Sequence, residues 1–138
     1  MDERRKCLTI ENQLAEFSKL EYWIAGLVEA WQLTAKTAFA VDLVINEALV
    51  NIISYAFQDN LRHFIDIEIQ DNGSHLLVDI TDDGQAFNPL VQPPLVVGAD
   101  LQNAAAGGRG IHLIKAYSDE QHYSFISGSN HLRLKLSK

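Results

Sequence analysis

Three segments of the chain alternate between an apolar stripe and a more polar one, and this pattern limits the possible folds more than any other feature. The segments cover residues 65–70, 76–82 and 132–137. Because successive side chains of a strand point to opposite faces, each segment predicts a strand with one buried and one wetter face. Residues 71–74 predict a hairpin turn between the first two strands. Gly128-Ser129-Asn130 predicts a turn between a strand near residues 121–127 and the last one.

Two further segments have the spacing of helices. Apolar residues recur at intervals of three and four between residues 13 and 31, and a second apolar run extends from about Thr34 to Phe57. Leu8 and Ile10 indicate a short first strand. Strands with one apolar face, combined with apolar helices, predict an α+β fold. We expect a two-layer α/β sandwich with the sheet on one side and the helices on the other.

Size and charge narrow the function. The chain has 138 residues, so we expect a single domain over 1–138. The net charge of −7 argues against non-specific nucleic-acid binding, which requires a basic surface. We see no signal-peptide core and no uninterrupted apolar run of about 18 residues. These features predict a cytoplasmic protein without a membrane segment.

The second helical run contains an acid and an amide, Glu47 and Asn51, which lie four residues apart and hence on one face of a helix. The residues around them are apolar on nearly all sides, which predicts that this helix is buried. Burying a carboxylate and a carboxamide without partners is costly, so the pair indicates a ligand site. The alternative is a buried polar pair that the protein backbone satisfies.

A second carboxylate stands at the end of the predicted strand 76–82. The alternation places Asp82 on the apolar face, and Gly84 then ends the strand. Charged side chains are rarely buried unpaired, so Asp82 is a candidate hydrogen-bond acceptor for an amine on a ligand. The alternative is an ordinary Asp-Gly turn, which suits Asp83 better.

Glycines at 107, 108 and 110 surround Arg109 ahead of an apolar segment that predicts a short helix. Glycine lets backbone N–H groups approach a phosphate closely, and a helix N-terminus favours anions. The spacing fits neither a P-loop nor a dinucleotide-binding fingerprint, and the alternative is the end of a flexible loop. Residues 85–108 contain all three prolines and no clear periodicity, so they predict a long functional loop.

In this order, the three pieces resemble the ATP-binding (Bergerat) fold of the GHKL superfamily, which includes gyrase B, heat-shock chaperones, histidine kinases and MutL. The matching segments are Glu47-Ala48-x-x-Asn51, Ile80-x-Asp82-x-Gly84-x-x-Phe87-Asn88-Pro89 and Gly107-Gly108-Arg109-Gly110-Ile111. The Phe-Asn-Pro and Gly-Gly-Arg-Gly segments are most similar to small anti-sigma-factor serine/threonine kinases. The resemblance covers essentially the whole chain. It implies a mixed, mostly antiparallel sheet with helices on one face.

The resemblance also implies roles for single residues. Glu47 would be the catalytic base or the group that orients the attacking hydroxyl, and Asn51 would be a Mg²⁺ ligand, since an amide oxygen suits a hard cation. Asp82 would accept a hydrogen bond from the adenine amine, and Gly84 would leave room for the ring. Residues 85–108 would form the ATP lid. The other residues expected to contact ATP are Phe87, Gly108, Arg109 and Gly110. For Arg109, contact with a partner protein or with solvent is an open alternative.

The family resemblance predicts an ATP- and Mg-dependent protein serine/threonine kinase. It would phosphorylate a small antagonist protein of the STAS type in a partner-switching system, and it would also bind a sigma factor. The main alternative is a nucleotide-dependent binding module without significant kinase activity, although Glu47 and Asn51 together argue against it. Two further alternatives are the catalytic half of a sensor histidine kinase and a clamp ATPase of the gyrase B or MutL type. We expect neither, because the first normally follows a helical hairpin with a phosphoacceptor histidine and the second usually needs further domains. Relatives of this kind often dimerise, so a homodimer is a further expectation.

Overall fold

The computed structural model describes residues 4–91 and 110–138. Its elements are, in order, β1 (Arg5–Glu11), the 3-10 turn η1 (Leu14–Glu16), α1 (Phe17–Ala30), α2 (Ala35–Tyr55), β2 (Phe64–Asp71), β3 (His75–Asp82), a helix of residues 110–117, β4 (Glu120–Ile126) and β5 (Ser129–Ser137). Each strand and helix expected from the sequence is present, and so is the hairpin turn between β2 and β3. Periodicity therefore predicted the elements correctly.

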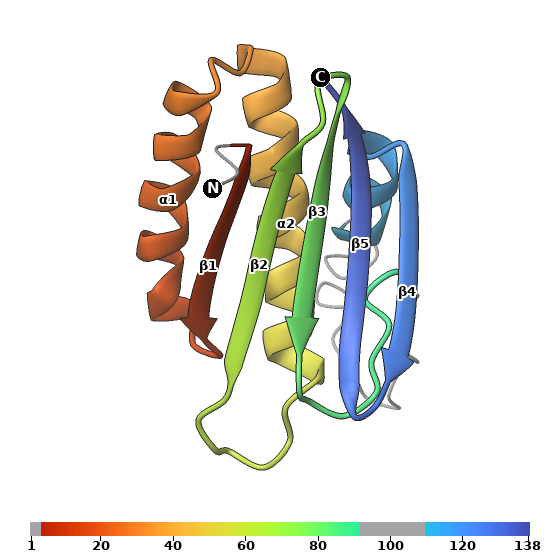
Figure 1. Ribbon diagram of the computed structural model, residues 1–138. Helices are drawn as coiled ribbons and strands as arrows, with labels where there is room; N and C mark the ends of the chain where they lie inside the picture. The colour runs from red at the N-terminus through yellow and green to blue at the C-terminus, as the bar shows by residue number, and fades with distance from the viewer. Residues whose placement is uncertain (1–3, 92–109) are drawn as a thin grey trace.

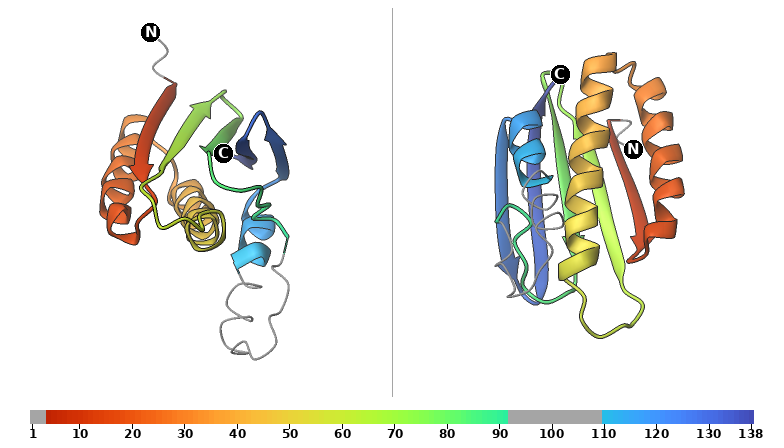
Figure 2. Two further views of the ribbon diagram at one scale, coloured as in Figure 1. Left: turned by 90° about the horizontal axis from the view of Figure 1, so that it is seen from below. Right: turned by 180° about the vertical axis from the view of Figure 1, so that it is seen from behind.

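The described strands form one sheet in the order β1-β2-β3-β5-β4, and each neighbouring pair is antiparallel. Helices α1, α2 and 110–117 lie together on one face of this sheet, and its other face is open (Figures 1 and 2). The predicted two-layer α+β sandwich is confirmed. The sheet is simpler than the mixed one that the resemblance implied, because no parallel pair occurs among the described strands.

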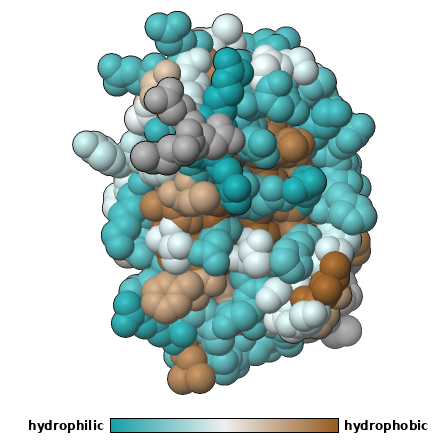
Figure 3. Space-filling model, in the orientation of Figure 1, coloured by the Kyte–Doolittle hydropathy of each residue, from teal (hydrophilic) through white to brown (hydrophobic). Residues whose placement is uncertain are grey.

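Burial along the strands follows the alternation in the sequence. The inward residues of the three central strands are Ile65, Ile67, Ile69, Leu76, Val78, Ile80, Leu132, Leu134 and Leu136. The opposite face is mostly hydrophilic (Figure 3). There Arg133 pairs with the Asp79 carboxylate through Nε, at 2.8 Å, and Arg5 pairs with Glu68 at 2.9 Å. The sheet thus offers one face to the helices and the other to solvent.

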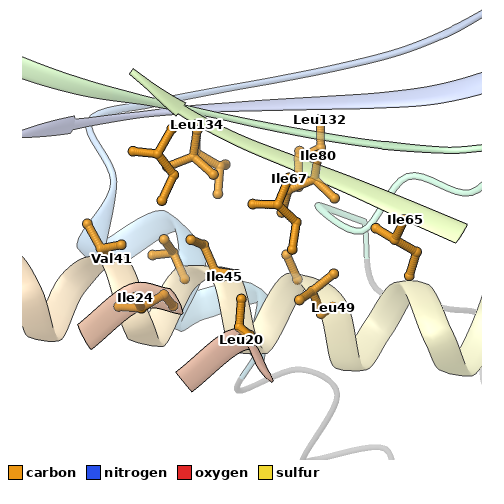
Figure 4. Packing of buried hydrophobic residues seen from close by; sticks show 14 of the residues in the cluster. Leu20, Ile24, Val41, Ile45, Leu49, Ile65, Ile67, Ile80, Leu132 and Leu134 are labelled. Carbon is orange, nitrogen blue, oxygen red and sulfur yellow. The ribbon is translucent and has the colours of Figure 1, made fainter. Parts of the chain in front are cut away.

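Helix α2 is the central element of the helical layer. Its residues Val41, Ile45 and Leu49 are fully buried against the apolar face of the sheet, beside Leu20 and Ile24 of α1 (Figure 4). Full burial of such side chains stabilises a fold by about 1.5–3 kcal/mol each. This packing fixes α2 against the sheet and so determines which of its faces remains available.

Helix α2 is also long and apolar enough to span a membrane by length and composition, with a mean hydropathy of 1.5. In the structure it lies on the sheet as the core helix of a domain, which explains the same composition and is consistent with a soluble protein. The prediction that this helix is buried on nearly all sides is wrong in part, because Phe39 and Val50 are exposed.

The turn between β4 and β5 begins one residue earlier and ends two residues earlier than the sequence predicts. It consists of Ser127 and Gly128, with φ of 53° and 80°, which is the left-handed backbone of a tight hairpin. Ser129 and Asn130 therefore belong to β5 rather than to the turn. This register places Asn130 directly opposite Asp82 of β3.

Candidate functional site

Glu47 and Asn51 project from α2 toward Gly110, which belongs to the helical segment 110–117. A Cβ atom added at Gly110 would lie 2.8 Å from Glu47 Oε2 and 3.7 Å from Asn51 Nδ2. The two side chains therefore share one face of α2, and Gly110 lies directly against that face. Because 2.8 Å is shorter than real Cβ contacts, any larger residue at Gly110 would displace the carboxylate. The structure brings these three candidate residues together.

Neither side chain is tied to the rest of the protein. Within residues 4–91 and 110–138, no hydrogen bond or ion pair involves the Glu47 carboxylate or the Asn51 amide. Asn51 is 8% exposed and Glu47 is half-buried. No fully shielded polar side-chain atom in the described chain lacks a partner, so the Asn51 amide must still reach open space. The Asn51 amide is therefore open to a ligand.

Asp82 ends β3 on the core face and is 4% exposed. Its Oδ1 accepts hydrogen bonds from the Gly84 backbone N–H, at 2.8 Å, and from Asn130 Nδ2, at 2.9 Å. Burial raises the pKa of the Asp82 carboxyl, and these two hydrogen bonds oppose that rise. Oδ2 accepts no hydrogen bond from the described residues. One carboxylate oxygen is thus anchored and the other is available to an amine.

Gly84 packs against the last turn of α2. A Cβ atom at Gly84 would lie 2.5 Å from the carbonyl oxygen of Ala56 and 3.0 Å from its Cβ. The same carbonyl accepts a hydrogen bond from the Gln85 backbone N–H at 2.9 Å. The structure therefore explains this glycine by the close approach of two backbones. The expected role of leaving room for an adenine ring stays a prediction.

Phe87 stands near the same end of α2. Its ring contacts that of Tyr55, with centroids 5.4 Å apart, and it is partly buried against the core. Its backbone N–H donates to Asn130 Oδ1 at 2.9 Å. Tyr55 lies one helical turn beyond Asn51 on α2. Phe87 therefore contacts the turn of α2 that follows the turn with Asn51. Glu47 and Asn51 meet Gly110, and the following turn meets the segment after Asp82.

The remaining predictions fall outside the described residues. Gly108 and Arg109 lie there, as do residues 92–108 of the expected ATP lid. Of that lid, residues 85–91 are described. They turn at Asn88, whose side-chain Oδ1 accepts from the Leu90 N–H at 2.9 Å. The expected contacts of Gly108 and Arg109 with phosphate stay predictions.

Sequence reasoning missed Asn130, which is 3% exposed and hydrogen-bonds to Asp82. The sequence predicts it in the turn between β4 and β5. A signal was present, because Asn130 shares the inward parity of Leu132, Leu134 and Leu136. Extending the strand by one inward residue would have placed an amide at the end of the core stripe.

A hollow of about 820 Å³ lies elsewhere, between β1 and α1. Lys6 and Leu8 line it from β1, and Lys19, Tyr22 and Trp23 line it from α1. Strand β1 is at the opposite edge of the sheet from β4. None of the candidate site residues lines this hollow, so its size does not make it the functional site.

Comparisons with known proteins agree with this geometry. A family model described as "Histidine kinase-like ATPase domain" matches residues 10–136. A relative from Bordetella bronchiseptica, named "Serine/threonine-protein kinase BtrW", is 30% identical over 115 residues. That alignment covers 82% of this chain and 80% of the relative. Both matches span the helix with Glu47 and Asn51 as well as the strand that ends at Asp82.

Proposed function

This chain belongs to the family of histidine kinase-like ATPase domains, and on that premise we propose that it is an ATP- and Mg-dependent protein serine/threonine kinase of the anti-sigma-factor type. Its substrate is a small antagonist protein of the STAS type in a partner-switching regulatory system. Membership of an ATPase family supports ATP binding. The similarity to a protein named as a serine/threonine kinase supports transfer of a phosphoryl group to a hydroxyl.

One observation carries the proposal: Glu47 and Asn51, which have no hydrogen-bond partner among the described residues, face Gly110. A structural role for these polar groups would require hydrogen bonds within the protein. The described residues offer none to either side chain. A ligand that supplies a cation and a hydroxyl group gives both side chains a function.

The donor set fits a magnesium-bound nucleotide. The Asn51 amide oxygen is a hard ligand, of the kind that Mg²⁺ uses alongside water and phosphate oxygens. Gly110 contributes no side chain, so the backbone there can approach a phosphate closely. Asp82 Oδ2 is an acceptor of the kind that the amine of adenine requires. These residues would hold the cation, the phosphates and the base, respectively.

When bound, ATP supplies the phosphoryl group, and magnesium neutralises the charge on its oxygens. The rest of the chemistry falls to the chain. Glu47 would accept the proton of the antagonist's serine or threonine hydroxyl as that oxygen bonds to the γ-phosphorus of ATP, while the bond from this phosphorus to the bridging oxygen breaks and ADP leaves. Asn51 and Asp82 act by position, because they hold the two ends of the nucleotide while Glu47 faces the incoming hydroxyl.

Transfer of radiolabelled phosphate from ATP to a co-encoded antagonist tests the proposal. Glu47→Gln is expected to lower the transfer rate by about 10²–10⁴-fold while ATP still binds, because only the proton acceptor is lost. Glu29→Gln, at an exposed glutamate of α1, is the matched control and should transfer at the wild-type rate. Full transfer by Glu47→Gln would refute the role of Glu47. ATP binding without transfer by the wild-type chain would favour the binding module.

The proposal extends to partners and location. We place the kinase in the cytoplasm, with the antagonist and a sigma factor as protein partners and a homodimer as its assembly. It binds neither nucleic acid nor membrane, and the net charge of −7 supports the first of these statements. Light scattering of the purified chain tests the dimer. Co-purification with the candidate sigma factor, with and without ATP, tests that partner.

A further inference from the structure

Asn130 uses every hydrogen-bonding position of its buried amide. Its Nδ2 donates to Asp82 Oδ1 and to the Gln85 carbonyl oxygen, both at 2.9 Å. Its Oδ1 accepts from the Phe87 backbone N–H, at 2.9 Å, and from the Tyr123 hydroxyl. An amide has two N–H donors and an oxygen that accepts two hydrogen bonds, so the group is saturated. It joins β5 to the end of β3 and to the segment that follows β3.

The orientation of the Asn130 amide is fixed by partners that can only donate or only accept a hydrogen bond. The Gln85 carbonyl can only accept and the Phe87 N–H can only donate, so the oxygen and nitrogen of Asn130 cannot exchange places. An N–H of Asn130 therefore points at Asp82 Oδ1, which also accepts from the Gly84 N–H. With two donors on Oδ1, any partner on a ligand must meet Oδ2. The hydrogen bond from Asn130 also lowers the pKa of Asp82, against the effect of burial, and so favours the ionised acceptor.

We propose that Asn130 is a positioning residue that gives the base-binding end of the site its preference for a 6-amino purine. It holds Asp82 as an acceptor with Oδ2 free, and a 6-amino group donates to that oxygen. A 6-oxo purine is disfavoured, because its 6-oxygen and Asp82 Oδ2 are both hydrogen-bond acceptors. Through Gln85 and Phe87, the same amide ties residues 85–91 to this carboxylate. The inference rests on the proposed function, since it needs a nucleotide whose base meets Asp82.

Equilibrium binding of ATP, inosine triphosphate and purine riboside triphosphate tests the inference, because these nucleotides differ at position 6 of the base. Asn130→Asp keeps the shape and the two acceptor bonds, but it replaces the donors with a carboxylate oxygen beside Asp82. Asn130→Ala removes the whole amide without adding a charge. In both variants, the preference for ATP over the other two nucleotides should fall by about tenfold or more. A ratio of affinities cancels any general weakening of triphosphate binding. Asn72→Asp, in the turn before β3, is the matched control and should keep the wild-type ratio.

A second variant tests the orientation without a buried charge, in case the substitutions at Asn130 impair folding. In Asp82→Asn, the donors from Asn130 and Gly84 require the new amide oxygen at the Oδ1 position, so its N–H₂ faces the ligand. The preference should then reverse toward inosine triphosphate.

Folded Asn130 variants with an unchanged ratio, or Asp82→Asn without reversal, would overturn the inference. Wild-type chain that binds ATP no better than purine riboside triphosphate would also overturn it, while leaving ATP binding intact. Wild-type chain that binds none of the three nucleotides would overturn the proposed function, and this inference with it.

Discussion

Replacing Gly110 with alanine should separate catalysis from stability at this site. The added methyl group would lie 2.8 Å from Glu47 Oε2, whereas ordinary contact begins at 3.4 Å. The oxygen ends a flexible side chain, so it can retreat by about 0.6 Å at little cost, and alanine favours a helix by up to about 1 kcal/mol over glycine. Asn51 Nδ2 would be at 3.7 Å, an ordinary contact, and need not move. The substitution therefore acts on one atom of the proposed catalytic base.

The expected result is a folded protein with poor phosphotransfer. Because misplacement by about 1 Å can cost about 100-fold in rate, Gly110→Ala should lower kcat by about 10–100-fold. Initial rates of phosphate transfer to the antagonist measure kcat, and thermal unfolding measures stability. Gly26→Ala in α1 is the matched control, since its Cβ would have no atom within 4 Å. Wild-type kcat in folded Gly110→Ala would show that Glu47 does not act where Gly110 meets it.

Two further predictions concern stability. Gly84→Ala should lower the free energy of unfolding by about 1–3 kcal/mol, because its Cβ would lie 2.5 Å from the Ala56 carbonyl oxygen and the backbone would have to move. Urea denaturation measures this change, and an unchanged midpoint would contradict the contact. Hydrogen bonds, to Asp59 above all and also to Asp83, raise the pKa of His63 from its ordinary 6.5. These hydrogen bonds should stabilise the fold fully below pH 6.5, and their contribution should fade as pH rises through the raised pKa. The free energy of unfolding of the wild type should therefore exceed that of His63→Gln at low pH but not at high pH. A difference between the two proteins that is independent of pH would refute this.

The strands were predictable because a period of two leaves few choices. Ile65, Ile67 and Ile69 cannot face solvent together without exposing an apolar stripe, so their common face determines the polarity of the sheet. The same parity placed Asp82 inward without any structural information. Asn130 escaped because Ser127, Gly128 and Ser129 all suit turns, and the choice between two adjacent turn positions depends on pairing with β3 rather than on local preference.

The close contacts of the site were not predictable, since each joins segments distant in sequence. The requirement for glycine at 84 comes from the carbonyl of Ala56, and the requirement at 110 comes from Glu47. Periodicity identifies an apolar helix but does not show which side meets the sheet. For that reason the composition of α2 suggested full burial, whereas Phe39 is exposed beside Tyr117, with ring centroids 5.6 Å apart.

The proposed site has the Asn51 amide and the Glu47 carboxylate facing a magnesium-bound adenine nucleotide. Isothermal titration of ATP with and without Mg²⁺, on wild type and Asn51→Ala, tests it most directly. Mg²⁺ should strengthen ATP binding to the wild-type chain by at least about tenfold, and this gain should largely vanish in a folded Asn51→Ala protein. An equal gain from Mg²⁺ in both proteins would show that Asn51 does not bind the cation.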